Sequence, residues 1–176
     1  MAGQSDSGGI DLAHMDGHRP LLRGTRHMAV AGHYLAAQAA LQILESGGNA
    51  IDAGVAGGIA LGVVQSQYVN VAGVASIMIY LAAENRVETI SGLGTWPRAV
   101  TPDLFEREHG GQIPEGILRT VVPAAPDAWI TALKRHGTMG FAEVAAAAIR
   151  FAAEGFVVYP HMAQMITQQA EDYRRW

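Results

Sequence analysis

The side chains of this sequence that could do acid–base chemistry are seven histidines, and none stands in a pattern typical of a catalytic triad. A serine or threonine nucleophile needs a base within hydrogen-bonding reach, and the G-x-S-x-G turn of serine hydrolases is absent from the sequence. There is no cysteine, which excludes a cysteine nucleophile and thiolate metal sites. We therefore interpret the histidines as surface or capping residues, at positions 14, 18, 27, 33, 109, 136 and 161.

Metal and cofactor motifs give no stronger signal. His14 and His18 have the i, i+4 spacing that suits a metal on a helix, but Gly17 and Pro20 beside them favour a solvated tail. The sequence contains neither G-x-G-x-x-G nor H-E-x-x-H, and no carboxylate cluster has metal-ligand spacing. The expectation is a protein without a metal or cofactor.

Composition narrows the class of protein. Hydrophobic residues make up 49% of the 176 residues and charged residues 16%, which is enough for one domain with a core. The net charge of −4 gives no support for nucleic-acid binding. The most apolar stretch, residues 50–64, is too short to span a bilayer and contains Asp52, and the N-terminus does not resemble a secretory signal. We expect a soluble protein of the cytoplasm, with the periplasm left open, and no membrane partner.

The first half of the chain predicts two successive helices. Residues 1–27 are polar and are expected to form a flexible arm, and Met28–Gly32 could be a short strand. Residues 33–46 favour a helix that Gly47-Gly48 ends, and Asn49 can cap a second helix over residues 50–64. That second helix is apolar on all sides and should be buried, and its glycines would permit close approach of another backbone.

The second half predicts a hairpin followed by helices. Residues 76–81 and 86–91 read as two strands joined by a short turn, and Gly92–Pro97 reads as a loop. Capping and punctuation signals then predict helices that begin at Thr101, after Pro123, at Phe141 and after Pro160. Strands flanked by helices on both sides in the sequence predict an α/β (α+β) fold.

Several segments in register resemble the gamma-glutamyltransferase family. Met28-Ala-Val-Ala and then Ala36–Ala53, with its G-G-N-A-I-D-A run at Gly47–Ala53, are similar to the opening of those enzymes. Four later segments continue the resemblance, at Ile77–Tyr80, Thr120–Pro126, His136–Met139 and Ala152–Phe156. The resemblance covers residues 28 to about 170, so residues 28–176 are assigned to the N-terminal portion of a large subunit.

The resemblance implies a four-layer αββα N-terminal-nucleophile hydrolase. Such a precursor cuts itself into a large and a small subunit, and the threonine freed at the start of the small subunit attacks the amide with its own α-amine as base. The resemblance thus implies a small-molecule amide substrate, and as partners the remaining large-subunit segment and the small subunit of the same precursor. It places no catalytic residue in this chain, which alone should be inactive.

Two departures from the family pattern concern the substrate. The glycine-rich turn of the family reads Ala72-Gly-Val-Ala-Ser76 here, and the arginine that grips the glutamyl α-carboxylate falls at Leu93. A leucine cannot pair with a carboxylate, so a small amide other than a standard gamma-glutamyl substrate is expected. The candidate substrate-binding residues are Gly92, Leu93, Gly94, Thr95 and Arg98, in a loop that could equally be a strand-to-helix connector.

An alternative is a non-catalytic binding or scaffold module that retains the family architecture, which the missing arginine would suit. Self-cleavage of the full-length protein separates the two. A half-sandwich would also expose an unpaired sheet edge and an apolar face, so the isolated chain is expected to aggregate unless its missing portion is present.

Overall fold

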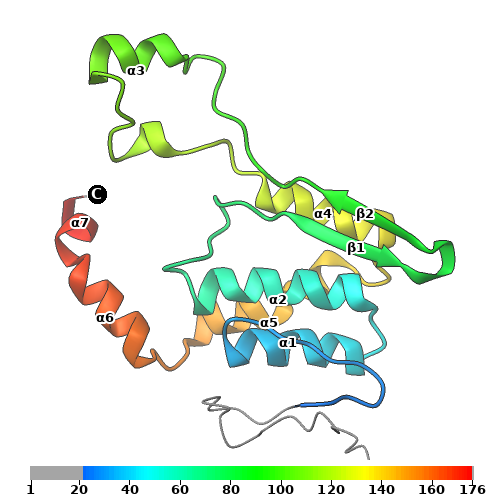
Figure 1. The fold of residues 1–176 in the computed structure, drawn as a ribbon. Helices are drawn as coiled ribbons and strands as arrows, with labels where there is room; N and C mark the ends of the chain where they lie inside the picture. Colours follow the sequence, from blue (N-terminus) through cyan, green and yellow to red (C-terminus); the bar gives the residue numbers. More distant parts are fainter. Residues whose placement is uncertain (1–21, 176) are drawn as a thin grey trace, which may run out of the picture.

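The computed structural model describes residues 22–175, and the pair His14 and His18, interpreted above as part of a solvated tail, lies outside them. The described part contains helices, two short 3-10 turns and one β-hairpin (Figure 1). In chain order the elements are α1 (Tyr34–Glu45), α2 (Ala50–Val64), β1 (Ile77–Leu81), η2 (Ala82–Glu84), β2 (Arg86–Ile90), α3 (Pro102–His109), η3 (Ile117–Arg119), α4 (Ala125–His136), α5 (Phe141–Glu154), α6 (Pro160–Gln168) and α7 (Ala170–Arg175).

Local signals in the sequence set the ends of α1 and α2. Gly47 follows α1 with a φ of 95°, a left-handed conformation that glycine adopts without steric cost. Asn49 then caps α2, because its side chain accepts hydrogen bonds from the backbone N–H groups of Ile51 and Asp52. Both predicted helices are confirmed.

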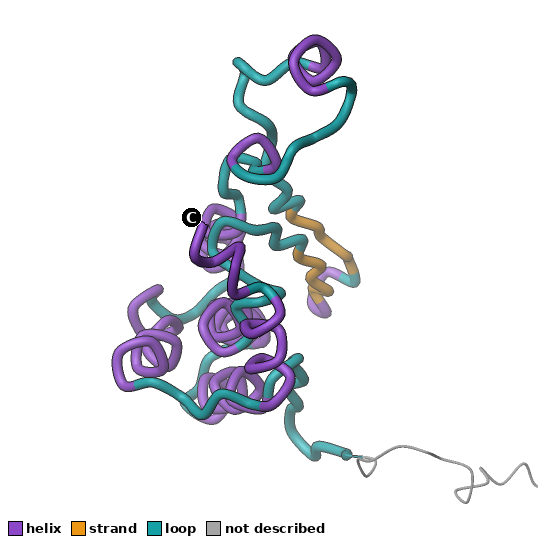
Figure 2. The backbone as a smooth tube through the Cα atoms, turned by 90° about the vertical axis from the view of Figure 1, so that its left-hand side faces the viewer, coloured by secondary structure: helices purple, strands orange, loops and turns teal. Residues whose placement is uncertain are grey.

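Helices α1, α2 and α5 lie side by side and form the base of the molecule (Figures 1 and 2). Their contact is built from small side chains that let the helices approach closely, since alanine adds little bulk between two backbones. The buried residues of this cluster are Ala36, Ala39, Ala60, Val64 and Ala148.

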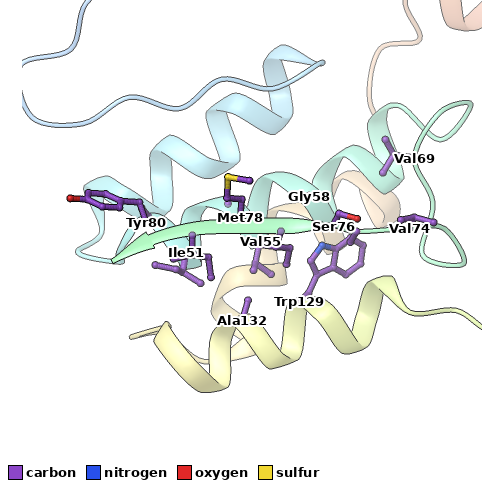
Figure 3. A pocket seen from close by; sticks show the side chains of 15 residues that line it. Ile51, Val55, Gly58, Val69, Val74, Ser76, Met78, Tyr80, Trp129 and Ala132 are labelled. Carbon is purple, nitrogen blue, oxygen red and sulfur yellow. The ribbon is translucent and has the colours of Figure 1, made fainter. Parts of the chain in front are cut away.

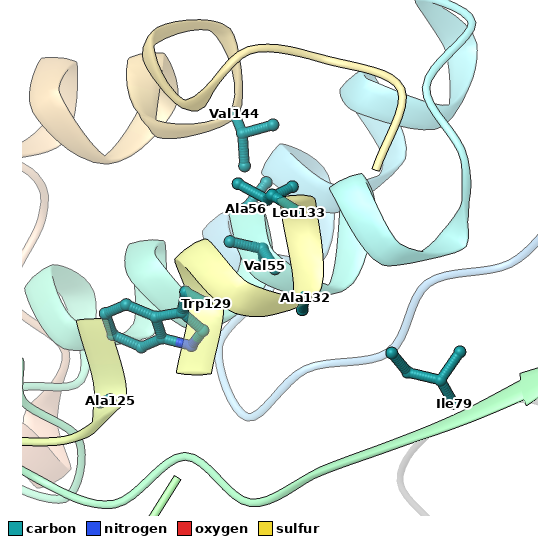
Figure 4. Close-up of a cluster of buried hydrophobic side chains, with 8 residues drawn as sticks. All are labelled: Val55, Ala56, Ile79, Ala125, Trp129, Ala132, Leu133 and Val144. Atoms are coloured by element: carbon teal, nitrogen blue, oxygen red, sulfur yellow. The ribbon is translucent and has the colours of Figure 1, made fainter. Parts of the chain in front are cut away.

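A second core cluster joins the hairpin to the helices (Figure 4). Trp129 of α4 is its largest side chain and is only 6% exposed. Ile79 of β1 faces this cluster, together with residues of α2 and α5. Gly58 makes room for the indole, because a Cβ there would lie 3.1 Å from Trp129 Nε1.

The hairpin is antiparallel and pairs Ile77 with Ile90 and Leu81 with Arg86. Asn85 closes it with a φ of 48°, a left-handed conformation that asparagine tolerates better than most residues. The predicted hairpin is therefore confirmed. Residues 91–124, including α3, extend away from the helices as the upper part of the molecule in Figure 2.

The possible strand over Met28–Gly32 does not form. The described sheet contains only β1 and β2, and no backbone hydrogen bond links residues 28–32 to any other residue of the 22–175 part. Figure 1 shows this segment as a loop that leads into α1. A strand needs a neighbour for its backbone groups, and the described residues offer it none.

Candidate functional site

The loop Gly92–Arg98 leaves β2 and is held at two points by backbone hydrogen bonds. Ala75 N–H donates to Gly92 O at 3.1 Å, and Val122 N–H donates to Thr95 O at 2.9 Å. The loop therefore lies between the segment that precedes β1 and the segment that precedes α4. All the predicted substrate-binding residues lie on this one stretch.

Two of those residues are glycines for structural reasons. Gly92 has a φ of 51°, and a Cβ there would lie 1.9 Å from Ala75 O. A Cβ on Gly94 would lie 2.0 Å from Val122 O. Distances this short cannot be relieved by side-chain movement, because the clashing atoms belong to the backbone. The connector interpretation thus accounts for both glycines.

The remaining predicted residues point to solvent. Leu93 is 61% exposed and Thr95 is exposed. Arg98 is exposed too and forms no hydrogen bond or ion pair with the rest of residues 22–175, so its guanidinium is free to meet an anion. Trp96 packs against Phe105 of α3, with ring centroids 5.2 Å apart. None of the five predicted residues lines the apolar hollow between α2 and β1.

A dense polar junction lies at the start of α2, and it is built by two of the segments that resemble the family. Asp52 is fully buried and accepts hydrogen bonds from Thr138 Oγ1 at 2.6 Å, from Thr138 N at 3.0 Å and from Met139 N at 3.3 Å. Oδ2 of Asp52, which accepts from the Thr138 hydroxyl, also accepts from Asn49 N at 2.9 Å. Asn49 Nδ2 in turn donates to His136 O at 2.6 Å.

This junction fixes both the ionisation of Asp52 and the packing around it. Burial alone would raise the pKa of Asp52, but hydrogen bonds from the Thr138 hydroxyl and from the backbone of Asn49, Met139 and Thr138 outweigh it and hold the pKa below its ordinary value. Gly137 fits because a Cβ there would lie 2.7 Å from Asp52 Oδ1. The buried carboxylate is a structural group, since its acceptor capacity is taken up by the fold.

Glu88 of β2 connects the hairpin to the end of α4. Arg135 Nη1 donates to Glu88 Oε1 at 2.7 Å, and His136 Nε2 lies 3.3 Å from Glu88 Oε2. Hydrogen bonds from Arg135, and then from His136, lower the pKa of Glu88 to about 2. The guanidinium of Arg135 at this helix end also complements its dipole.

The described histidines have structural partners. His33 caps α1, because its Nδ1 accepts from Leu35 N at 3.2 Å, and burial lowers its pKa. His27 Nε2 lies 2.7 Å from Glu45 Oε1, and His161 Nε2 lies 2.8 Å from the Tyr68 hydroxyl. Within residues 22–175 no histidine forms a hydrogen bond with a serine or threonine hydroxyl, which is the arrangement that a histidine-activated nucleophile needs.

Residues 22–175 contain neither a metal-binding cluster nor a helix suited to spanning a membrane. This part of the chain holds no group of three or more His, Asp or Glu side chains that could bind a metal ion. None of its helices combines the length and apolar character needed to cross a membrane.

Sequence reasoning missed the role of Asp52 and Thr138. The contact between Asp52 and Asn49 did have a signal in the sequence. Asp52 follows Asn49 by three residues, which is the spacing of a capping box. The partner residues Thr138 and Met139 carry no local signal, because their contacts lie 86 and 87 residues away in sequence.

Solved structures identify the fold. The chain is similar to the crystal structure of Helicobacter pylori gamma-glutamyltranspeptidase, with a TM-score of 0.82, 27% identity and coverage of 89% of this chain and 46% of that one. It is also similar to a cephalosporin acylase from Bacillus halodurans, with a TM-score of 0.74, 28% identity and coverage of 92% and 32%. The chain thus has an α/β fold of the kind found in N-terminal-nucleophile hydrolases, and the predicted fold class is confirmed.

Sequence comparison gives the family. Residues 36–176 match the family model described as gamma-glutamyltranspeptidase, and the chain belongs to that family. It is 40% identical over 162 residues to the Acylase ACY 1 proenzyme of Pseudomonas sp. strain V22, and 29% identical over 157 residues to the Glutathione hydrolase proenzyme of Bacillus subtilis strain 168. It covers 29% and 27% of the lengths of these two relatives, which means that it spans less than a third of either.

Proposed function

We propose that this chain is the N-terminal portion of the large subunit of an autoprocessing amide hydrolase or acyltransferase. The match of residues 36–176 to the family model carries the proposal. Two relatives that it resembles are named as proenzymes, which fits a precursor that is cut into subunits. In the proposal, the nucleophilic threonine, its α-amine base and the oxyanion donors come from further polypeptide of the same precursor.

The proposed substrate is a small amide other than a standard gamma-glutamyl compound. Leu93 stands where the family resemblance places an arginine, and an exposed leucine offers no pairing to an α-carboxylate. Identity to an acylase, at 40%, exceeds identity to a glutathione hydrolase, at 29%, and favours an acyl amide. The loop Gly92–Arg98 would face this acyl group, with Arg98 as its free cation.

In this proposal the described residues position the site and do not react. Gly92 and Gly94 let the loop lie tightly against the backbone at Ala75 and Val122. The hydrogen bond between Asp52 and Thr138 holds α2 to the segment that joins α4 and α5. Residues of α2, α4, α5 and β1 pack together in one core cluster. The polypeptide that brings the nucleophile would meet a rigid platform, and preorganisation of this kind reduces the cost of orienting a substrate.

The test uses the full-length protein encoded by the complete reading frame. Incubation should convert one band on a denaturing gel into two, with a threonine at the new N-terminus of the smaller product by mass spectrometry. The processed protein should hydrolyse an N-acyl amide of the cephalosporin side-chain type faster than a gamma-glutamyl anilide, and residues 1–176 alone should hydrolyse neither. Persistence of a single band would favour the alternative of a non-catalytic scaffold module.

A further inference from the structure

His33, at the N-terminal end of α1, is a buried titratable side chain that the proposed function does not use. It is only 5% exposed. Its ring stacks on the ring of Tyr34, with centroids 4.6 Å apart, and it also contacts the rings of Phe156 and Tyr159, at 6.4 Å and 5.1 Å. These last two residues follow α5 in the chain, so His33 joins the start of α1 to the connection between α5 and α6.

The capping hydrogen bond of His33 fixes the position of its proton. Leu35 N–H donates to His33 Nδ1 at 3.2 Å, so Nδ1 is the acceptor and the neutral ring carries its proton on Nε2. Nε2 is buried and has no hydrogen-bond partner among residues 22–175. A second proton can therefore bind only to Nδ1, where it removes the acceptor that caps α1.

The surroundings of His33 oppose a charged imidazolium. The N-terminus of a helix carries a partial positive charge, which repels a cation. The titratable groups that face the ring are the phenols of Tyr34 and Tyr159, and no carboxylate of residues 22–175 is bonded to it. Burial accordingly lowers the pKa of His33. A falling pH therefore favours any conformation in which this ring reaches water.

Residues 156–161 cover the ring of His33, and side-chain contacts alone hold them to α1 and α2. Phe156 packs against the cluster formed by α1, α2 and α5, and Gln67 Nε2 donates to the Tyr159 hydroxyl. Gln67 Oε1 is buried without a hydrogen-bond partner in the described chain, which weakens this contact. No backbone hydrogen bond joins residues 156–161 to α1 or α2 within residues 22–175. From this segment α6 leads away from the base of the molecule (Figure 1).

Helix α1 is held more firmly than the segment that covers His33. Ala36 and Ala39 of α1 are buried against Ala60 and Val64 of α2. Movement of α1 would break this packing, whereas movement of residues 156–161 breaks only the side-chain contacts described above. The covering segment is therefore the part that moves when the ring of His33 is exposed.

His161 is the other histidine of this segment, and its contact tolerates protonation. Its side chain is exposed, its ring stacks on that of Tyr68, and its Nε2 lies 2.8 Å from the Tyr68 hydroxyl. A hydroxyl donates to a neutral imidazole and accepts from a protonated one, so this hydrogen bond persists in both states. Of the two histidines, His33 is the one whose protonation opposes docking of the segment.

We propose that His33 makes the docking of residues 156–161, and of α6 and α7 after them, sensitive to pH: protonation of His33 Nδ1 breaks the cap to Leu35 and releases the segment from α1 and α2. The released form binds one proton more than the docked form. Docking is therefore strongest above about pH 6.5, the ordinary pKa of a histidine, and weakens as the pH falls below that value. The inference stands apart from the proposed function, because it involves no reaction.

The hollow between α2 and β1 provides an internal reference for the test (Figure 3). None of the residues that line it is His, Asp or Glu, so no side chain there changes its charge between pH 5.5 and pH 7.5. Peptides from β1, which borders this hollow, should therefore not respond to pH in this interval.

Hydrogen exchange of the full-length protein, measured on peptides from residues 155–168, tests the proposal. After correction for the intrinsic pH dependence of exchange, opening of this segment in the wild type should increase at least about threefold from pH 7.5 to pH 5.5, because one proton is taken up. Opening that does not change would overturn the proposal. An equal increase in peptides from β1 would also overturn it, because it would show a general loosening of the fold.

Two variants assign the response to one histidine. In His33→Asn the amide oxygen can still cap α1 but does not titrate, so opening should change by less than about 1.5-fold between the two pH values. His161→Gln is the matched control and should keep the wild-type response. A response that persists in His33→Asn and disappears in His161→Gln would assign the sensor to His161 and overturn the proposal.

A measurement on the unsubstituted protein decides the question even if His33→Asn fails to fold. NMR of the isotope-labelled ring nitrogens of His33 should show a proton on Nε2 alone at pH 7.5. The second proton should appear on Nδ1 over the same pH interval in which residues 156–161 open. A proton on Nδ1 at pH 7.5, or protonation of the ring while the segment stays docked, would contradict the proposal.

Discussion

The junction at Asp52 is built by segments that resemble the family, whereas the loop Gly92–Arg98 departs from the family pattern, and the fold uses the two in opposite ways. Asp52 is fully buried and accepts hydrogen bonds from three residues, whereas Leu93 is 61% exposed and Arg98 has no partner within residues 22–175. The most specific motif, G-G-N-A-I-D-A, therefore encodes the scaffold. The departure at Leu93 falls on an exposed side chain, which can change without disturbing that scaffold.

If the junction at Asp52 is structural and the loop is not, removal of the Asp52 carboxylate should have the largest effect on stability. Asp52→Ala leaves the N–H groups of Asn49, Thr138 and Met139 without their acceptor, and we expect a loss of about 3 kcal/mol or more in the free energy of unfolding. Urea unfolding of the full-length protein measures it. Asp127→Ala, at an exposed position in the first turn of α4, is the matched control and should cost about 0.5 kcal/mol or less. Similar losses for both variants would refute the structural role of Asp52.

Substitution of Gly137 tests the packing of the same junction and leaves its charge unchanged. A Cβ there would lie 2.7 Å from both Asp52 Oδ1 and Leu133 O, so Gly137→Ala should destabilise the fold by about 1–3 kcal/mol. Gly62→Ala is the control, because its nearest atom would be 4.0 Å away and alanine favours a helix interior, with a gain of up to about 1 kcal/mol. Thermal unfolding of the two variants should shift in opposite directions, and a shared direction would contradict the packing described.

A substitution of Leu93 in the loop should change substrate specificity and leave the stability of the fold unchanged. Leu93→Arg restores a cation at the position where the family resemblance places one, and the kcat/KM ratio for a gamma-glutamyl anilide over a neutral acyl amide should rise about tenfold, or 1.4 kcal/mol. Ile149→Arg on α5 is the control, since both side chains are 61% exposed in the wild-type chain. An unchanged ratio in Leu93→Arg would leave the loop as a connector only.

Substitution of Glu88 should have the smallest effect on stability, and that effect should depend on pH. Because hydrogen bonds from Arg135 and His136 lower its pKa from 4.5 to about 2, its contribution to stability is present above pH 4.5 and is lost as the pH falls toward 2. The difference in stability between wild type and Glu88→Gln should therefore shrink over that interval. Glu154→Gln, which removes an exposed carboxylate at the end of α5, should show no such convergence.

Local signals were sufficient to predict the helices. Residues 50–64 were expected to form a helix, and α2 has those bounds, because Gly47-Gly48 and Asn49 act on the residues next to them. The hairpin was also predicted from local signals, because a short turn separates its two strands. The strand expected at Met28–Gly32 was wrong for the described chain, because an apolar run cannot reveal whether a neighbouring strand exists.

The site was harder to predict than the fold. The candidate substrate-binding residues were chosen by their position in the family pattern, and their role stays a prediction. They are Gly92, Leu93, Gly94, Thr95 and Arg98. The structure adds that two of them are glycines because of backbone crowding. The contact between Asp52 and Thr138 could not be read from one sequence, because a carboxylate in a helix gives no indication of which distant donor it will meet.

The distance along the chain between Asp52 and Thr138 also has a consequence for synthesis on the ribosome. Their hydrogen bonds close a loop of 86 residues, and the entropy of closing such a loop costs roughly 4 kcal/mol. Until Thr138 leaves the exit tunnel, α2 carries an acidic group that has not yet gained most of its donors. A nascent chain paused before that point should hold α1 and α2 loosely, and release of about twenty more residues, enough to complete α5, should dock them together in one step.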